Sequence, residues 1–320
     1  MGFVDPRTDF GFKRIFGSDR SKPVLRNFLN AIVYDGEERI ADLEIVDPYQ
    51  NPNIQDLKQS ILDVKVRLDD ETIVLIEMQI LPVEAFTERI LYNTAKAYGN
   101  QLERGQLYME LKPVISVTIA DFILFPGEDD IPVSRFKLLD AKGRCCTDHL
   151  ELIFAELPKL PQSPEALGTR SELWLYFVQQ VGKLDDIPDV LTDRDFDAAF
   201  EIASESQLSR EEYELAEKQR MKLLDDLGRL SYAEKKSREE GLARGRAEGL
   251  ARGLAEGRAE GREEGREEGR EEGREEGREE GREEGKIEIA RMMLANFDVE
   301  TICRATGLSR EIVEDLTNDD

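Results

Sequence analysis

A glycine recurs at every fourth position from Gly241 to Gly285, and arginine and glutamate fill most of the positions between the glycines. This low-complexity segment separates two stretches of more ordinary sequence. As a random coil the segment would be a flexible linker. As a helix it would carry a penalty of about 1 kcal/mol for each glycine relative to alanine.

The charges within the repeat favour a helix at one spacing and oppose it at another. Glu263 and Arg266 illustrate the favourable i,i+3 pairs, whereas at i,i+4 arginine meets arginine and glutamate meets glutamate. A glycine stripe lets two helices approach closely, and a period longer than the helical turn of about 3.6 residues favours right-handed wrapping. We expect a helix that self-associates into a homo-oligomer, with a disordered spacer as the alternative.

The 320 residues suggest two or three folded units. Alternating apolar segments at the start indicate an α/β domain, and the next region opens with a strand and becomes mainly helical. After the repeat, the sequence regains an amphipathic pattern. We therefore divide the chain into an α/β domain, a helical extension that packs on it, the repeat and a C-terminal helical module, at residues 1–126, 127–240, 241–285 and 286–320.

Composition restricts the function. The net charge of −25 contrasts with the basic footprint of most nucleic-acid-binding proteins, although a local basic patch or bound cations can offset acidic surfaces elsewhere. The three cysteines, including the adjacent Cys145 and Cys146, have no disulfide-framework or metal-ligand spacing. The single histidine, His149, argues against histidine-dependent triads and zinc sites. With no long apolar run or signal peptide, we expect a reducing, cytoplasmic compartment and no membrane segment.

Four polar groups interrupt a stretch, Leu62 to Ile80, that otherwise predicts two strands joined by an acidic turn. Because side chains alternate between the faces of a strand, Asp63 and Lys65 share one face, and so do Glu77 and Gln79. Directly opposed residues of a hairpin lie on the same face. A three-residue connection opposes Asp63 to Glu77, whereas a two-residue turn opposes it to an isoleucine. The buried face sets the register, so the sequence predicts an odd-length connection or a bulge.

Two carboxylates that converge on one spot repel each other unless a proton or a cation lies between them. Magnesium, or another hard divalent cation, prefers oxygen ligands and accepts an incomplete protein shell that waters and a phosphodiester oxygen complete. Such a metal would lower the pKa of a bound water and neutralise charge on the phosphate. Lys65 could position the water or hold the phosphate. From spacing alone, the alternative is the ordinary polar face of an exposed sheet.

An ordered set of motifs lies along the first half of the chain: "TDFGFKRIFG" (Thr8–Gly17), "ILDVKV" (Ile61–Val66), "IEMQ" (Ile76–Gln79) and "ERILYNTAKAYGNQL" (Glu88–Leu102). This set resembles the recombination-promoting nuclease / putative transposase family, within the PD-(D/E)XK nuclease superfamily. The resemblance continues through "LELIFAELPKL" and "YELAEKQRM" into the repeat. It implies a restriction-endonuclease-like α/β core with a mixed central sheet flanked by helices, followed by a mainly helical region, the repeat helix and a small C-terminal helical module.

The superfamily places an aspartate on one strand and an acid-any-lysine triplet on the next. The resemblance therefore implies that Asp63 and Glu77 are the metal ligands, and that Gln79 stands where lysine is usual. Glutamine can orient a water but carries no charge. Either another cation serves, with Lys65 the nearest candidate, or catalysis is slow.

The helix that follows the hairpin offers Arg89, Tyr92 and Lys96, which are spaced by three and four and share a face. The resemblance implies that this helix borders the active site. Arg89 and Lys96 could then contact DNA phosphates, and Tyr92 could support the metal ligands. The alternative is an ordinary half-exposed helix face.

The opening motif contributes two basic residues, Lys13 and Arg14, as candidate contacts to the DNA backbone. Asp9 is a candidate supporting residue, with a turn or capping role as the alternative. The aromatic residues of this motif are more typical of a core than of base stacking.

The segment "VETICRATGLSREIVEDL" near the C-terminus predicts a helix, a tight turn at Gly307 and a second helix with Ser309 as its N-cap, an arrangement that resembles a helix-turn-helix. Arg310 lies where a DNA-reading helix would need a basic residue, but Glu311 and Glu314 surround it. We favour an interaction or dimerisation module over a DNA-reading one.

These features predict a magnesium-dependent DNA endonuclease, a hydrolase of phosphodiester bonds that is linked to DNA recombination or mobile elements. The alternative is a catalytically weak or inactive nuclease-fold protein that binds DNA or drives assembly. A regulatory scaffold is a third possibility. The expected partners are DNA and further copies of the chain.

Overall fold

A computed structural model describes residues 2–47, 49–50, 60–61, 63–127, 131–184 and 186–318. The chain divides into two compact units, Met1–Ser231 and Tyr232–Asp320. No helix in the described part of the chain combines the length and apolar composition that crossing a bilayer requires.

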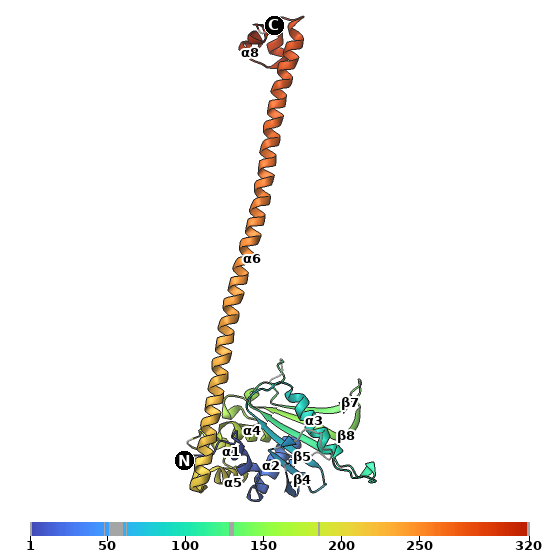
Figure 1. Ribbon diagram of the computed structural model, residues 1–320, viewed down its shortest axis with the longest axis vertical. Helices are drawn as coiled ribbons and strands as arrows, with labels where there is room; N and C mark the ends of the chain where they lie inside the picture. Colours follow the sequence, from blue (N-terminus) through green and yellow to red (C-terminus); the bar gives the residue numbers. More distant parts are fainter. Residues whose placement is uncertain are drawn as a thin grey trace. The chain divides into compact units, whose positions relative to one another are not determined.

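A six-stranded sheet is the centre of the first unit (Figure 1). Its strand order is β1-β4-β5-β6-β8-β7. The strands β5, β6 and β8 run parallel to one another, and the remaining neighbours are antiparallel. The sheet is therefore mixed, which confirms the predicted fold class. The strands are β1 Leu43–Val46, β4 Val64–Leu68, β5 Ile73–Gln79, β6 Val114–Ala120, β7 Val133–Leu139 and β8 Cys145–Glu156, while β2 Tyr49–Gln50 and β3 Ser60–Ile61 form a separate two-stranded sheet.

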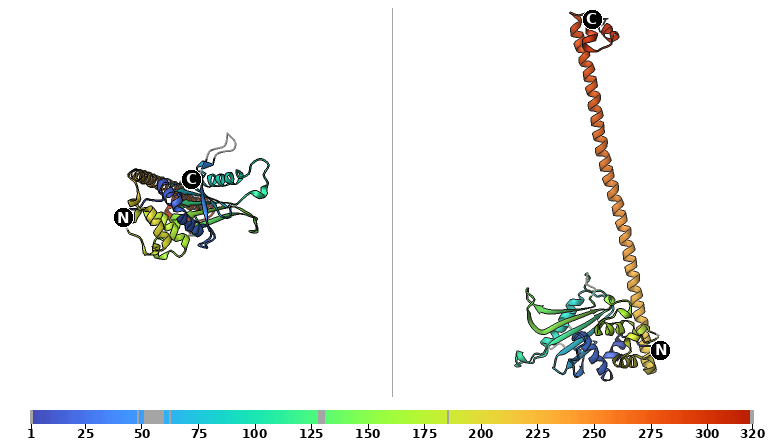
Figure 2. Two further views of the ribbon diagram at one scale, coloured as in Figure 1. Left: turned by 90° about the horizontal axis from the view of Figure 1, so that it is seen from below. Right: turned by 180° about the vertical axis from the view of Figure 1, so that it is seen from behind.

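Helices cover both faces of this sheet (Figures 1 and 2). The larger hydrophobic core joins the sheet to α1 Asp9–Phe16, α2 Lys22–Val33, α4 Arg170–Gln180 and α5 Arg194–Ala203. On the other face, α3 Phe86–Gly99 packs against β5, β6 and β8. Short 3-10 helices lie at Asp19–Ser21, Tyr108–Glu110, Leu157–Lys159, Pro164–Ala166, Val181–Lys183, Asp189–Leu191 and Glu205–Gln207.

The burial pattern of the strands explains these layers. Every residue of β6 is buried, as expected for a central strand covered on both faces. In β4 the buried Val64, Val66 and Leu68 alternate with the more exposed Lys65 and Arg67. The apolar set faces the larger core, and the polar set faces the α3 side of the sheet.

Aromatic side chains fill the middle of the larger core. The rings of Phe16 and Phe28 lie 4.8 Å apart, and those of Phe28 and Trp174 lie 6.0 Å apart. The Trp174 indole N–H donates to Asn27 Oδ1 at 2.7 Å, so this buried polar group is satisfied. Phe12 and Phe16 of the opening motif are core residues, as the sequence predicts, and Trp174 is buried with them, whereas Phe10 is only partly buried.

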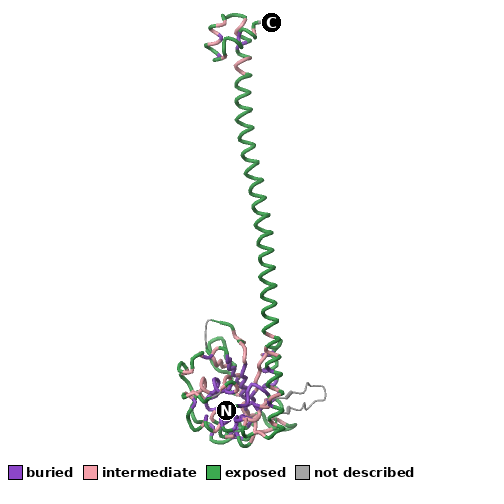
Figure 3. The backbone as a smooth tube through the Cα atoms, turned by 90° about the vertical axis from the view of Figure 1, so that its left-hand side faces the viewer, coloured by how far each residue is buried: buried purple, intermediate pink, exposed green. Residues whose placement is uncertain are grey.

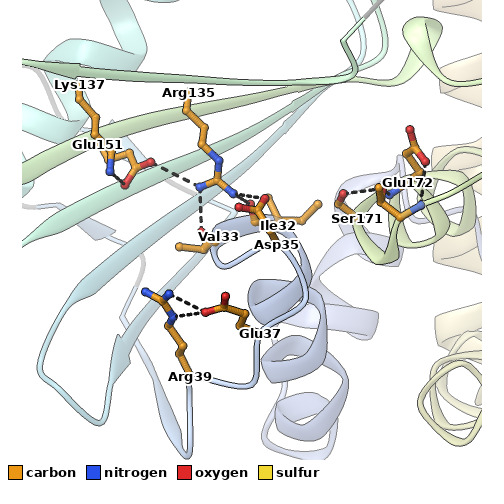
Figure 4. Close-up of polar contacts among 11 residues, drawn as sticks. Ile32, Val33, Asp35, Glu37, Arg39, Arg135, Lys137, Glu151, Ser171 and Glu172 are labelled. Atoms are coloured by element: carbon orange, nitrogen blue, oxygen red, sulfur yellow. Dashed lines mark hydrogen bonds and ion pairs between the residues drawn. The ribbon is translucent and has the colours of Figure 1, made fainter. Parts of the chain in front are cut away.

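Strand β7 was not expected, because the region after Gly127 predicts one strand followed by helices. It lies at the edge of the sheet, paired with β8 alone (Figures 1 and 2). Figure 4 shows how Arg135 fixes this edge strand to the end of α2. Its guanidinium donates to the carbonyl oxygens of Ile32 and Val33, each at 2.8 Å, and pairs with Asp35 at 2.8 Å. A cation suits the carbonyl end of a helix.

The last helix of the first unit, α6 Arg210–Leu294, continues into the second unit without a break through the glycine repeat. Ser209 and Glu212 form a capping box at the start of this helix: Ser209 N–H donates to Glu212 Oε2 at 2.8 Å, and Glu212 N–H donates to Ser209 Oγ at 3.3 Å. All residues from 231 to 284 are exposed (Figure 3).

A small core closes the end of the second unit. Ala290, Ile302 and Val313 are fully buried and join the end of α6 to α7 Val299–Thr306 and α8 Arg310–Asn318. Gly307 between the two short helices has a φ of +69°, a left-handed conformation that glycine adopts without a steric penalty. The helix-turn-helix arrangement predicted at this end of the chain is therefore present.

Candidate active site

The β4–β5 hairpin has the register that face parity predicts. Val64 pairs with Ile76, and one further step of the same register brings Asp63 opposite Glu77. The connection is three residues long, because Leu68 N–H donates to Thr72 O at 2.9 Å. Its last residue, Glu71, has a φ of +67°, which is typical of a three-residue hairpin loop with a left-handed final position.

Burial raises the pKa values of the two facing carboxyls. For Asp63 the main cause is desolvation, and a hydrogen bond from Met78 N–H to Oδ2, at 2.7 Å, opposes it. For Glu77 desolvation again dominates; the cation of Arg89 lowers the pKa, and the charge of Asp63 raises it. The two acids therefore form a coupled, partly desolvated pair that favours a cation beside it.

Glu77 has one oxygen bonded and one oxygen open. Oε1 accepts a short hydrogen bond from Arg89 Nη2, whereas the buried Oε2 has no hydrogen-bond partner among the described residues. Glu156 at the end of β8 provides a contrast. Its Oε1 accepts from the backbone N–H of Leu124 at 2.6 Å, and Lys159 Nζ lies 2.8 Å from its Oε2. Glu156 Oε2 likewise accepts no hydrogen bond from a described residue, but the ammonium of Lys159 compensates its charge as an ion pair, whereas no described cation lies against Glu77 Oε2.

Gln79, in the position where lysine is usual, holds an arginine beside Glu77. Its Oε1 accepts from Arg89 Nη2 at 2.7 Å, and its Nε2 donates to Leu81 O at 2.8 Å. The Arg89 guanidinium also lies over the ring of Phe86, 5.1 Å from its centroid. The glutamine amide is thereby oriented so that its acceptor oxygen faces the cation.

Lys65 lies on the polar face of β4, as its sequence position predicts, but it is not the cation that contacts Glu77. It pairs with Leu75, two residues along β5 from Glu77, and forms no ion pair among the described residues. Burial lowers the pKa of its ammonium, and the nearby charge of Arg67 adds to the effect. The cation bonded to Glu77 is therefore Arg89 and not Lys65.

A cavity of about 350 Å³ opens beside Asp63 and Gln79. The start of α1, with Asp9 and Thr8, forms one part of its wall. The first turns of α6, including Lys222, form another. Sequence reasoning missed the contribution of α6, because it lies more than one hundred residues along the chain from the hairpin.

The two basic residues of the opening motif, Lys13 and Arg14, each bind an acidic side chain. Lys13 is half exposed and pairs with Asp9 at 2.7 Å. Arg14 donates to Glu212 Oε1 at 2.9 Å and to Ile202 O at 3.0 Å, an arrangement that favours a role in holding α6 to α1 over a DNA contact.

Tyr92 and Lys96, the two other candidates on α3, differ in exposure. Lys96 is only 8% exposed, so it does not present its ammonium freely to a DNA backbone. Tyr92 is 40% exposed and makes no hydrogen bond to Asp63 or Glu77. Of the three residues on this helix, Arg89 alone contacts the facing acids.

A buried charge network that the sequence did not predict supports the floor of the cavity. Arg7 donates to both carboxylate oxygens of Asp5, at 3.0 and 2.7 Å, and to Asp121 Oδ2 at 3.0 Å. Asp121 follows β6 directly, and its N–H donates to Gln79 O at 2.9 Å. The network thus ties the N-terminal segment to the ends of β5 and β6, next to Asp63 and Gln79.

A family model described as "PD-(D/E)XK nuclease family transposase" matches residues 6–233. The chain belongs to this family. A second model, "Rpn/YhgA-like nuclease family, C-terminal HTH domain", matches residues 283–318, the segment that contains α7 and α8. Searches of curated proteins and of solved structures found no match.

The donor atoms of this PD-(D/E)XK nuclease-family chain suit a hard divalent cation. Asp63 and Glu77 supply carboxylate oxygens from opposed positions, and Glu77 Oε2 is buried without a hydrogen bond from any described residue. The described residues contain no group of three or more histidine, cysteine, aspartate or glutamate side chains placed to hold a metal. A two-carboxylate site completed by waters and a phosphate oxygen is a common arrangement for magnesium.

Proposed function

We propose that this chain is a divalent-metal-dependent DNA endonuclease that hydrolyses phosphodiester bonds. The observation that carries the proposal is the convergence of two partly desolvated acids, one of which has an open buried oxygen, in a chain of the PD-(D/E)XK nuclease family. Asp63 and Glu77 would hold magnesium, which when bound would lower the pKa of a water and offset charge on the phosphate.

The chain's own residues would supply orientation and charge. Met78 N–H holds Asp63, and Gln79 and Glu77 together hold the Arg89 guanidinium. Arg89 would supply the positive charge that Gln79 lacks, with two acceptors that keep its donors in one place. Lys65, the earlier candidate for this role, would contribute at most a more distant charge.

Plasmid cleavage tests the proposal. Purified protein is incubated with supercoiled plasmid and magnesium, beside Asp63→Ala and Glu77→Ala. We expect nicking or linearisation by the wild type and a loss of about 10³-fold in each variant, equivalent to several kcal/mol of transition-state stabilisation. No cutting by the wild type, or undiminished cutting by both variants, would contradict the metal-site assignment.

The transposase description of the family supports a role in DNA recombination or mobile-element biology. The plasmid assay addresses the chemistry, and cells that carry Asp63→Ala address the biology. We expect recombination between marked DNA segments to fall in these cells. A recombination frequency equal to that of the wild type would separate the nuclease chemistry from this role.

We also propose that copies of the chain associate through α6 and the C-terminal module. The glycines from 241 to 285 have open space around them, so a second helix could approach the backbone closely. A lone helix with so many glycines is marginal in water, and a partner would stabilise it. Deleting residues 241–285 should lower the molecular mass in light scattering. An unchanged mass would leave the segment as a spacer.

A further inference from the structure

The first turns of α6 present one face to the cavity beside Asp63. Gln219, Lys222, Leu223 and Asp226 line the cavity. Their spacing of three, four and seven places them on a single helix face.

Several contacts hold this face of α6 in place. Phe10 N–H donates to Gln219 Oε1 at 2.8 Å, and Leu223 is 6% exposed. One end of the helix is also fixed by the ion pair between Arg14 and Glu212, at 2.9 Å. Lys222 therefore projects from a helix segment that is packed against α1 and not from a free arm.

The charges around the cavity single out Lys222. Arg7 and Lys222 are the basic residues among those that line the cavity in the described part of the chain. Arg7 is buried and committed to Asp5 and Asp121. Lys222 is exposed and forms no ion pair with any residue that the structure describes. It is thus the cavity cation whose charge remains available.

We propose that Lys222 binds a backbone phosphate of DNA that enters this cavity. A polyanion that approaches two carboxylates needs compensating positive charge, and lysine is a common phosphate ligand that acts as a point charge. Gln79 supplies no charge, and Arg89 is bonded to Glu77. Lys222 is therefore a substrate-binding residue on α6, and this assignment rests on the proposed function in taking DNA as the substrate.

A binding measurement tests the inference apart from cleavage. Fluorescence anisotropy of the full chain in EDTA at low ionic strength uses two labelled duplexes of equal length and unrelated sequence. Lys222→Ala is compared with Lys222→Arg and with Lys218→Ala, which removes an exposed lysine one turn earlier that does not line the cavity. Thermal melting followed by Trp174 fluorescence checks that each variant folds.

A phosphate contact predicts a specific set of results. Lys222→Ala should bind both duplexes roughly tenfold more weakly, as expected for the loss of one charge-assisted contact. The slope of log affinity against log salt concentration should become smaller by about one. Lys222→Arg and Lys218→Ala should bind like the wild type.

Three results would overturn the inference: Lys222→Ala binds as Lys218→Ala does, it affects one duplex only, or the wild type binds neither duplex. The plasmid assay distinguishes this failure from failure of the proposed function. Cutting that depends on Asp63 and Glu77, together with normal DNA binding by Lys222→Ala, would reject the inference alone. If Lys222→Ala binds DNA more weakly but the wild type does not cut the plasmid, the phosphate contact of Lys222 stands and the proposed nuclease activity is rejected.

Discussion

Arginine and glutamate occur in two contrasting environments in this protein. At the end of β5, the Glu77 side chain is 13% exposed, lies opposite Asp63 and bonds Arg89. Along α6, the arginines and glutamates between residues 241 and 284 are all exposed (Figure 3). Burial raises the pKa of Glu77, whereas water and salt screen the exposed charges, so each contributes little.

The comparison shows that charge density alone does not identify a site. The repeat holds far more ionisable groups than the hairpin, yet the hairpin has the desolvated acids, the oriented amide and the open carboxylate oxygen.

The largest stability effect should come from Arg7, the centre of the buried network. Arg7→Met leaves Asp5 and Asp121 without their cation, so the free energy of unfolding of the first unit should fall by about 3–5 kcal/mol. Urea unfolding followed by fluorescence of Trp174, the only tryptophan, reports on this unit. The matched control is Arg258→Met in the repeat, which should change this free energy by less than about 0.5 kcal/mol. Equal losses in the free energy of unfolding for Arg7→Met and Arg258→Met would contradict the difference between the buried network and the exposed repeat.

Arg89 should matter more to cleavage than Lys65. Arg89→Ala removes the cation that lowers the pKa of Glu77, so the acidic limb of the pH–rate profile should move to higher pH. The rate at neutral pH should fall on the order of tenfold, the loss expected for a charge-assisted contact. Lys65→Ala is the control and should leave the acidic limb in place. If the acidic limb shifts in Lys65→Ala and not in Arg89→Ala, Lys65 and not Arg89 is the cation that acts on Glu77.

Asp63→Asn should abolish cleavage and yet stabilise the protein. The folded-state pKa of Asp63 is raised above its ordinary value of 3.8, so the native state holds more protons than the unfolded state in the window between the two values. Stability therefore falls as the pH rises through that window. Asparagine can still accept the Met78 hydrogen bond without the buried charge. We expect a gain of up to about 1 kcal/mol at neutral pH.

This gain should disappear below the ordinary aspartate pKa, where both states of the wild type are protonated. Urea unfolding at neutral and at acidic pH measures it, with the exposed Asp225→Asn as the control. A loss of stability at neutral pH, or the same gain at both pH values, would contradict the burial of an unfavourable charge at Asp63.

The sequence was sufficient to predict the hairpin, because the alternation of side chains and the need for one apolar face leave few registers for Asp63 and Glu77. The mixed sheet was implied by the resemblance that the ordered motifs carry, and the helix-turn-helix arrangement was predictable from Gly307 and Ser309. Strand β7 was not predicted, because "VSRFKLL" contains two basic residues and, at the edge of the sheet, has no buried residue.

The contacts between distant segments were beyond sequence reasoning. The bond between Arg89 and Gln79 depends on how α3 crosses the sheet, and periodicity gives only the face of a helix. Arginine is a residue type that commonly contacts the DNA backbone, but the side chain of Arg14 binds Glu212. Lys222 lies in a helix segment whose pattern is ordinary, and its place beside the cavity follows from the packing of α6 on α1.

Metal binding measured without DNA is the most direct test of the central claim that Asp63 and Glu77 hold a divalent cation. Thermal unfolding followed by Trp174 fluorescence is recorded across a magnesium titration, with sodium chloride at matched ionic strength. If Asp63 and Glu77 hold the cation, the Tm of the wild type should rise with magnesium concentration, by the linkage between binding and folding, and the Tm of the Asp63→Asn, Glu77→Gln double variant should not. A wild-type Tm that does not respond, or an equal rise in the double variant, would contradict that claim.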